Sequence, residues 1–441
     1  MSFTSLTFAI MIMICALAGF FVKGNSRRLL LLGVNVLFYL SFGLGQAIYL
    51  VLASLVVYFV CEKINEKKLA AVVIGLVIGL VFFKYAPLFT KGLIVTVGIS
   101  FFSFKLISYA VDKYKGNINE SSLLDYLIYI SFFAQIVAGP ISRFNDFEKE
   151  LESCDRELSY AELRYGLMRF AMGAFEKVVV ADRIGLIVDQ VFGSYTDYNG
   201  LSFIFAMMLY SFQIYADFDG YSNMAIGLGK LFGIGCKENF LRPYMAKNLQ
   251  DFWRRWHISL SQWFRDYVYI PLGGNRKGEL RQYLNVMVVF VLSGLWHGST
   301  IGYALWGFLH GLIQILSRRF LNGYKGNIVV NFIVVTFLWL FFRVQDFGML
   351  SYVLRSLVNI GGYAFDLGGF GLGKSEVLVT LVLVVCFIVV DVLREKGQLA
   401  KFDQLPLVVR WSVYFGMIVL FVLLGVWGPG YNAADFIYQQ F

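Results

Sequence analysis

Long runs of apolar residues recur along the whole chain, and each is separated from the next by a short polar or basic segment. The runs are continuous rather than alternating, and most are about 15–20 residues long, enough for a helix to cross a hydrocarbon core of about 30 Å. Since lipid offers the backbone no hydrogen-bond partner, continuous runs of this kind must form helices. The pattern predicts an all-α polytopic membrane protein.

The number of membrane segments is predicted to be about eleven to thirteen, a range set by the runs that are short or carry charge. The run at 163–180 carries three basic residues, which favours a position partly in the membrane interface. Two further runs are expected to flank a break at the motif ADFDGYSN (216–223). The apolar runs cover residues 4–22, 29–42, 47–60, 69–83, 93–111, 123–137, 163–180, 201–216, 224–234, 283–297, 301–316, 328–342, 377–392 and 408–427.

Composition supports a membrane protein and excludes an ordinary soluble one. The chain is 58% hydrophobic and only 15% charged, and its mean hydropathy is +0.67. The net charge of +9 would suit a nucleic-acid partner, but the basic residues are spread over short loops between apolar runs. That distribution is typical of the positive-inside rule, so no nucleic-acid binding is expected and membrane lipid is the expected surrounding.

The basic loops also predict an orientation. Under the positive-inside rule, the loops at 23–28, 61–68, 318–325 and 394–401 face the cytoplasm and both termini face outside. Neither an internal repeat nor a domain boundary is evident, so residues 1–441 are expected to form a single membrane domain. The five cysteines are scattered without a C-x-x-C pair, which favours structural thiols.

All three histidines lie between residues 257 and 310. His297 ends an apolar run that carries it to membrane depth, where a polar ionisable group is by default a functional hypothesis. Desolvation keeps such a ring neutral, as a general base requires. Gly294 and Gly298 would let a substrate or another backbone approach closely. The alternative is a structural histidine that is hydrogen-bonded to a neighbouring helix.

His257 lies in a segment where aromatic and basic residues are interleaved at helical spacing. This pattern predicts one helix at the membrane interface or dipping into it, running from about Trp253 to Tyr267. The alternative is a plain amphipathic anchor that carries one histidine. In the loop that follows, Arg276 and Lys277 could pair with the phosphates of a cytosolic donor, although such loops often only fix topology.

The sequence favours neither a metal site nor glycosyl transfer. The histidine separations of 40 and 13 residues match no compact metal-ligand motif, so no metal is expected. Asp217 and Asp219 resemble a glycosyltransferase D-x-D, but no soluble nucleotide-binding domain accompanies them. They are expected to be turn-forming or helix-capping carboxylates at a membrane break.

At this point the motifs resemble those of the membrane-bound O-acyltransferase (MBOAT) family, in particular a bacterial branch typified by alginate O-acetylation. The similarity extends over almost the whole chain, and its motifs are long and specific. The matching segments are 98–116, 129–144, 217–233, WRRWHISLSQWFRDYVYIPLGGNRKG (253–278), SGLWHG (293–298), LWLFFR (338–343) and FIYQQF (436–441).

The resemblance implies a ring of tilted membrane helices with re-entrant and interfacial segments around a central funnel, with a catalytic core at about 98–320. His297 matches the family's catalytic histidine and is assigned as general base. His257 matches the second site position, and we expect it to orient the donor or to stabilise developing charge. The residues expected to support them are His310, Trp296, Asp251, Arg254 and Arg255.

The implied activity is that of a membrane O-acetyltransferase of the bacterial inner (cytoplasmic) membrane. Acetyl would pass from a cytoplasmic thioester, acetyl-CoA or another acyl thioester, to an extracytoplasmic polysaccharide by way of a partner O-acetyltransferase protein. The thioester would be a substrate, and no tightly bound cofactor is expected. The donor would reach His297 from below past His257, and the acceptor through the funnel from outside. The alternatives are a lipid-linked glycan flippase or transporter, which predicts inverted repeats, and a structural scaffold, which leaves the histidines without a role.

Overall fold

The computed structural model describes residues 3–86, 89, 96–320, 326–359, 367–398, 402 and 404–426. The FIYQQF segment at 436–441 and part of the glycine-rich loop that precedes residue 367 lie outside these described residues. The described part of the chain consists of helices and loops, without a strand. The predicted all-α fold is therefore confirmed.

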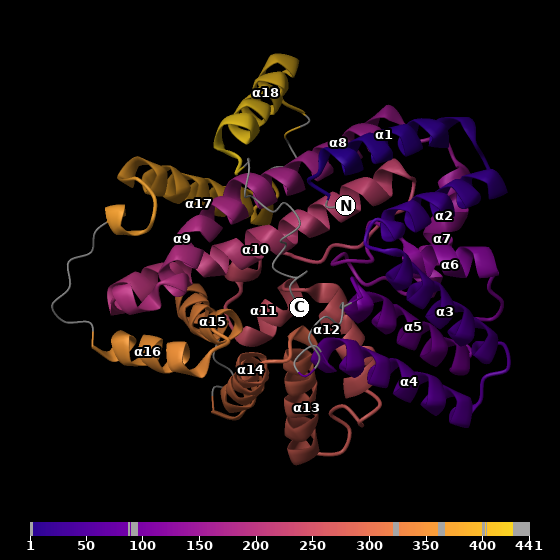
Figure 1. Ribbon diagram of the computed structural model, residues 1–441, viewed down its shortest axis with the longest axis horizontal. Coiled ribbons are helices and arrows are strands. Elements are labelled where there is room, and N and C mark those ends of the chain that lie inside the picture. Colours follow the sequence, from indigo (N-terminus) through magenta and orange to yellow (C-terminus); the bar gives the residue numbers. More distant parts are fainter. Residues whose placement is uncertain are drawn as a thin grey trace.

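The helices pack side by side into one body, with α10 running through its middle (Figure 1). Two helical segments, η3 and η6, have the wider π-helical winding. The principal helices are α1 (Leu6–Phe21), α2 (Asn25–Leu40), α3 (Leu44–Cys61), α4 (Glu66–Tyr85), α5 (Ile99–Tyr114), α6 (Leu123–Ser131), α7 (Phe144–Glu152), α8 (Tyr160–Phe175), η3 (Glu176–Ala181), α9 (Asp182–Gly193), α10 (Gly200–Leu231), α11 (Leu249–Arg255), α12 (Ile258–Phe264), η6 (Arg265–Tyr269), α13 (Glu279–His297), α14 (Ile301–Phe320), α15 (Ile328–Arg343), α16 (Phe347–Val358), α17 (Lys374–Glu395) and α18 (Leu407–Leu424).

Among the described residues, five helices are long and apolar enough to cross a membrane: α3, α4, α10, α17 and α18. They differ in how much protein surrounds them. In α10, 72% of the most apolar 18-residue stretch is buried inside the protein, whereas in α18 none of it is. Helix α10 is thus the core element, while α18 lies at the edge of the body (Figure 1). Many apolar side chains of α18 are exposed. The predicted total of eleven to thirteen membrane segments stays a prediction.

The expected break at residues 216–223 is wrong. Helix α10 runs without interruption for 32 residues, and the D-x-D carboxylates lie in its interior. They need no break because each has a cationic partner from another helix: Asp217 lies 2.7 Å from Lys177, and Asp219 lies 3.6 Å from Arg394. A buried charge is tolerated in a helix when it is paired in this way.

The expected interfacial position of residues 163–180 also needs correction at Lys177. This residue is only 2% exposed, and its ammonium lies 2.6 Å from Asp182 in addition to its contact with Asp217. Helix α8 continues into η3 and then into α9 as one long rod beside α10 (Figure 1). Gly173 and Gly220 allow the two rods to touch, because a Cβ added at Gly173 would lie 2.3 Å from the Gly220 carbonyl oxygen.

Candidate active site

A close crossing of α13 and α14 positions His297. A Cβ added at Gly294 would lie 2.2 Å from the carbonyl oxygen of Tyr303, and one added at Gly307 would lie 2.3 Å from that of Phe290. Both helices therefore need glycine where they meet. The close backbone approach expected at Gly294 is confirmed. Because α13 ends at His297, this crossing holds the imidazole against α14.

The single interfacial helix expected around His257 is wrong. Helix α11 ends at Arg255 and α12 begins at Ile258, and His257 between them has a left-handed backbone with φ of 43°. A residue other than glycine seldom adopts this conformation, and when it does the strain often marks a functional site. The break turns His257 inward, where its side chain is fully buried.

A hydrogen bond to Asn239 orients the His257 ring. The Nδ1 atom of His257 lies 3.3 Å from the Oδ1 atom of Asn239. That oxygen also accepts from the backbone N–H of Ser259 at 3.1 Å, so it is an acceptor and His257 must donate to it. In the neutral ring the proton therefore lies on Nδ1, and Nε2 carries the lone pair.

Two tryptophans bring the three histidines together. The Trp296 ring lies 4.8 Å from the His297 ring and 6.3 Å from the His257 ring, centroid to centroid. The Trp306 ring lies 5.2 Å from the His297 ring and 4.9 Å from the His310 ring. Of the predicted site residues, the three histidines and Trp296 thus form one buried row with Trp306, in which histidines and tryptophans alternate.

His310, on α14, forms one end of this row. Its Nδ1 atom accepts a hydrogen bond of 3.3 Å from the indole N–H of Trp253 on α11. That bond leaves the ring proton on Nε2, which is buried without a partner among the described residues. Helices α11, α12, α13 and α14 accordingly gather around one cluster, below α10 in Figure 1.

Lys84, which the sequence reasoning overlooked, lies beside the row. Its ammonium donates to the backbone carbonyl of Trp296 and, at 3.4 Å, to the hydroxyl of Ser100. It also lies 5.4 Å from the Trp296 ring. Lys84 thus caps the C-terminal end of α13, next to His297. The available signal was a lysine directly after an apolar run, a costly placement that often marks function.

Of the two arginines predicted to support His257, Arg255 is paired with other residues. Arg255 pairs with Asp251 at 3.1 Å within α11 and with Glu395 of α17 at 3.2 Å. Arg254 is exposed. These contacts fasten α11 to α17, and a role of either arginine toward a donor stays a prediction.

The basic loop residues Arg276 and Lys277 are exposed and lie at the opposite end of α13 from His297. The helix between them has 19 residues, or about 27 Å from first to last at 1.5 Å per residue. Arg276 and Lys277 therefore do not contact His297. Binding of the donor by this loop, away from the histidines, stays a prediction.

Metal chemistry has no evident basis in the part of the chain that the structure describes, where no group of three or more His, Cys, Asp and Glu side chains could hold an ion. The five cysteines are free thiols, as expected from their spacing. The row consists of imidazoles and indoles, with one lysine beside it.

Comparison with known proteins places this arrangement in a class. The profile of the membrane-bound O-acyltransferase family matches residues 46–351. Peptidoglycan O-acetyltransferase of Helicobacter pylori is 35% identical over 386 residues, which are 74% of this chain and 73% of that protein. The chain belongs to the membrane-bound O-acyltransferase family, and the predicted family and acyltransferase class are confirmed.

Other relatives differ in the substrate that their names state. A probable alginate O-acetylase of Pseudomonas putida is 35% identical over 288 residues, covering 64% of this chain and 59% of that protein. Teichoic acid D-alanyltransferase of Bacillus subtilis is 33% identical over 231 residues, covering 50% of this chain and 58% of that protein. The matches thus span less than two thirds of these two proteins.

Proposed function

We propose that this chain transfers acetyl groups from a cytoplasmic thioester to hydroxyls of an extracytoplasmic polysaccharide, in the bacterial inner membrane. The observation that carries the proposal is the buried row in which Trp296 separates His257 from His297. The names of the Helicobacter pylori and Pseudomonas putida relatives support acetyl as the group and a glycan as the acceptor.

The reaction needs a base, and His297 is proposed to supply it. An acceptor hydroxyl loses its proton to the imidazole while its oxygen attacks the thioester carbon, forming a tetrahedral oxyanion. Collapse of this intermediate breaks the carbon–sulfur bond, and the proton on His297 leaves with the thiolate. General base catalysis of this kind typically contributes about 10²–10⁴-fold.

The oxyanion needs a hydrogen-bond donor, and neutral His257 is poorly suited to that task. Since Asn239 fixes its proton on Nδ1, the Nε2 atom can only accept a hydrogen bond, not donate one. We therefore assign His257 to orienting a substrate N–H or O–H. The indole N–H of Trp296, buried and without a hydrogen-bond partner among the described residues, is the better oxyanion donor.

Passage across the membrane follows from the direction of α13. Its N-terminal end adjoins the basic loop at 276–277, which is predicted to be cytoplasmic, and its C-terminal end carries His297. The donor would enter from the loop side and the acceptor from the other side. Acetyl could then pass to a partner O-acetyltransferase outside the membrane, with acetyl-CoA consumed as a substrate.

The test is acetyl transfer by the purified protein. The chain in detergent would be incubated with radiolabelled acetyl-CoA and with a soluble glycan or a water-only control, and label in glycan and release of free coenzyme A would be measured. Thiol release that depends on His297 supports the proposal. Label that stays in intact acetyl-CoA under every condition contradicts it and favours the transporter alternative.

A further inference from the structure

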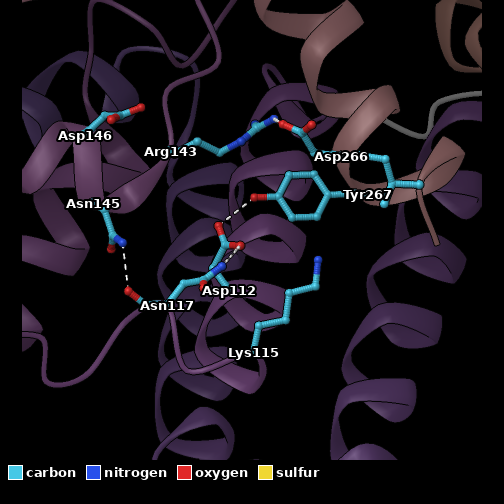
Figure 2. A pocket seen from close by; sticks show the side chains of 9 residues that line it. Asp112, Lys115, Asn117, Arg143, Asn145, Asp146, Asp266 and Tyr267 are labelled. Atoms are coloured by element: carbon cyan, nitrogen blue, oxygen red, sulfur yellow. Dashed lines mark hydrogen bonds and ion pairs between the residues drawn. The ribbon is translucent and has the colours of Figure 1, made fainter. Parts of the chain in front are cut away.

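The two ends of α5 differ in how the charges beside them are balanced. At its C-terminal end, α5 lines a polar pocket together with the start of α7 and η6, where three carboxylates meet two cations: Asp112, Asp146, Asp266, Lys115 and Arg143. Arg143 reaches toward Asp266 at 3.3 Å, and the phenolic O–H of Tyr267 donates to Asp112 at 2.6 Å (Figure 2). The cations at this end therefore have carboxylates beside them.

Beside the N-terminal end of α5 lies Lys84, the next-to-last residue of α4. Its ammonium donates to two neutral acceptors, the backbone carbonyl of Trp296 and, at 3.4 Å, the hydroxyl of Ser100 in the first turn of α5. Its side chain is half-buried. Among the residues that the structure describes, no carboxylate lies within ion-pair distance of it, so the charge of Lys84 has no counter-charge there.

Capping the end of α13 does not by itself require a charge. A backbone carbonyl also accepts from a neutral group, and the hydroxyl of Tyr85 donates to the neighbouring carbonyl of Leu295 at 3.1 Å. A partly buried charge without a partner is costly, and in a membrane protein it often marks function. The lysine at position 84 therefore favours a role for the charge itself.

The charge of Lys84 lies next to His297. Trp296, whose carbonyl accepts from the ammonium, directly precedes His297, so the ammonium lies within roughly 6 Å of the Cα atom of His297 by standard peptide and hydrogen-bond geometry. The rings of Trp296, Trp306 and Phe342 that pack against the imidazole carry no charge. An acyl group that reaches His297 therefore meets the field of a cation in surroundings that screen it less than water does.

Acyl groups differ in how they respond to such a field. Acetyl is neutral, whereas an aminoacyl group carries an ammonium on the carbon next to the reacting carbonyl. Since only two bonds separate that nitrogen from the carbonyl carbon, the ammonium cannot be kept away from the site. The names of the relatives contain both kinds of group, acetyl for the Helicobacter pylori protein and D-alanyl for the Bacillus subtilis protein.

We propose that Lys84 determines the acyl specificity of the site, because its charge admits a neutral acyl group and rejects one that carries an ammonium. This assignment rests on the proposed function and adds to it the chemical class of the acyl group. For two like charges about 8 Å apart at an effective dielectric constant of about 20, the repulsion corresponds to roughly thirtyfold weaker binding.

The test compares two thioesters of equal size and different charge. Propionyl-CoA and glycyl-CoA have acyl groups with the same number of non-hydrogen atoms, and only glycyl carries an ammonium at about pH 6.5. Each displaces radiolabelled acetyl-CoA from the purified protein, and the ratio of the glycyl-CoA to the propionyl-CoA concentration needed for half displacement is measured. This ratio should be large in the wild type.

Lys84→Gln keeps N–H donors for the Trp296 carbonyl but has no charge, so it should lower the ratio by roughly thirtyfold. The preference that remains reflects the cost of desolvating the ammonium. Lys84→Met is a second uncharged variant with the same expected result, and Lys84→Arg should preserve the ratio. Lys67→Gln, at an exposed lysine near the other end of α4, should leave it unchanged.

A wild type that binds both thioesters equally well, or a ratio that the uncharged variants leave unchanged, would overturn the assignment. So would a ratio that Lys84→Arg lowers as much as Lys84→Gln does. Displacement requires binding only, which keeps this result separate from the proposed function. A ratio that depends on the charge at position 84 without any acetyl transfer supports the role of Lys84 and rejects the reaction, whereas absence of acetyl-CoA binding in every form rejects both.

Discussion

Two buried polar regions of this protein contrast in how their polar groups are satisfied. In the charge cluster of η3, α10 and α17, Glu176 lies 3.2 Å from Arg394 and accepts a 2.5 Å hydrogen bond from Asn223. In the histidine row of α11–α14, the indole N–H groups of Trp296 and Trp306 have no hydrogen-bond partner among the described residues. One region is held together by opposite charges, and the other keeps unused donors.

The contrast separates stability from function. A buried polar group without a partner costs free energy, so a folded protein retains one mainly where a ligand or water completes it. Charges that are paired across helices instead fix those helices relative to one another, and removing one partner is costly. We therefore expect substitutions in the histidine row to affect turnover first, and substitutions in the charge cluster to affect folding first.

The largest effect is expected at His297. His297→Gln keeps much of the side-chain volume among the surrounding rings but removes the basic nitrogen. The rate of acetyl transfer should fall by about 10²–10⁴-fold, the usual contribution of a general base, while the thermal unfolding midpoint in detergent stays close to that of the wild type. Release of coenzyme A from radiolabelled donor measures the rate.

His310→Gln is the matched control, because His310 contacts the same Trp306 ring. It should reduce the rate far less than His297→Gln. Retention of more than about a tenth of the wild-type rate by His297→Gln would show that His297 is not the base.

The second largest effect is expected at Arg394, on the stability of the fold. Arg394 lies within 3.2–3.7 Å of three carboxylates, those of Glu176, Asp219 and Asp391. Arg394→Met would leave them buried without their shared cation and should lower the free energy of unfolding by about 3–5 kcal/mol. The folded fraction that remains should retain the wild-type rate per molecule. Thermal unfolding and active-site-normalised kinetics measure the two quantities separately.

Arg319→Met provides the control, because Arg319 pairs with Glu279 at 3.8 Å on the surface and both side chains are largely exposed. Such pairs contribute about 0–1 kcal/mol. Equal destabilisation by the two substitutions would mean that the charge cluster adds nothing beyond a surface ion pair.

The sequence predicts those parts of the fold and the site whose contacting residues lie close together along the chain. His257, His297 and His310 could be selected because they are rare, lie close together in sequence and fall in family motifs. The α13–α14 crossing was indicated by Gly294. The ion pairs of Asp217 and Asp219 are not predictable, since Lys177 and Arg394 are far away in sequence. Without these partners, the motif alone predicts a break.

The inward turn at His257 is likewise not predictable from the spacing of its neighbours in sequence. Aromatic residues on either side of it keep helical spacing, which predicts one helix, yet a single left-handed residue ends α11 and starts α12. The constraint comes from Asn239, whose backbone carbonyl accepts from the Ile258 N–H at 2.9 Å. A contact between segments that are separated in sequence thus determines the local backbone.

A smaller effect on turnover is expected at Trp296. Trp296→Phe keeps a ring between the two histidines and removes the indole N–H. If this group donates to the oxyanion, kcat should fall by about tenfold to about a hundredfold, the contribution of a hydrogen bond to a charged group, with KM for the donor unchanged because the oxyanion exists only in the transition state. Trp306→Phe, which removes the other unpartnered indole N–H, should change kcat less. A change confined to KM would assign Trp296 to donor binding.

The smallest effect is expected at Lys84, which shares a feature with each region. Like the charge cluster, it is a cation that satisfies a buried polar group, the backbone carbonyl of Trp296. Like the histidine row, it lies next to His297, the proposed base. A cation at a helix C-terminus typically contributes about 0.3–1 kcal/mol, so Lys84→Met should lower the free energy of unfolding by no more than about 1 kcal/mol. Because the capped carbonyl is that of Trp296, the loss should also let the end of α13 shift and reduce kcat a few-fold, since catalysis is sensitive to small misplacements. Lys84→Arg should recover part of kcat, and Lys67→Met, an exposed lysine at the other end of α4, should change neither quantity. A loss of stability with kcat unchanged would make Lys84 a helix cap and nothing more, and would place it with the charge cluster rather than with the histidine row.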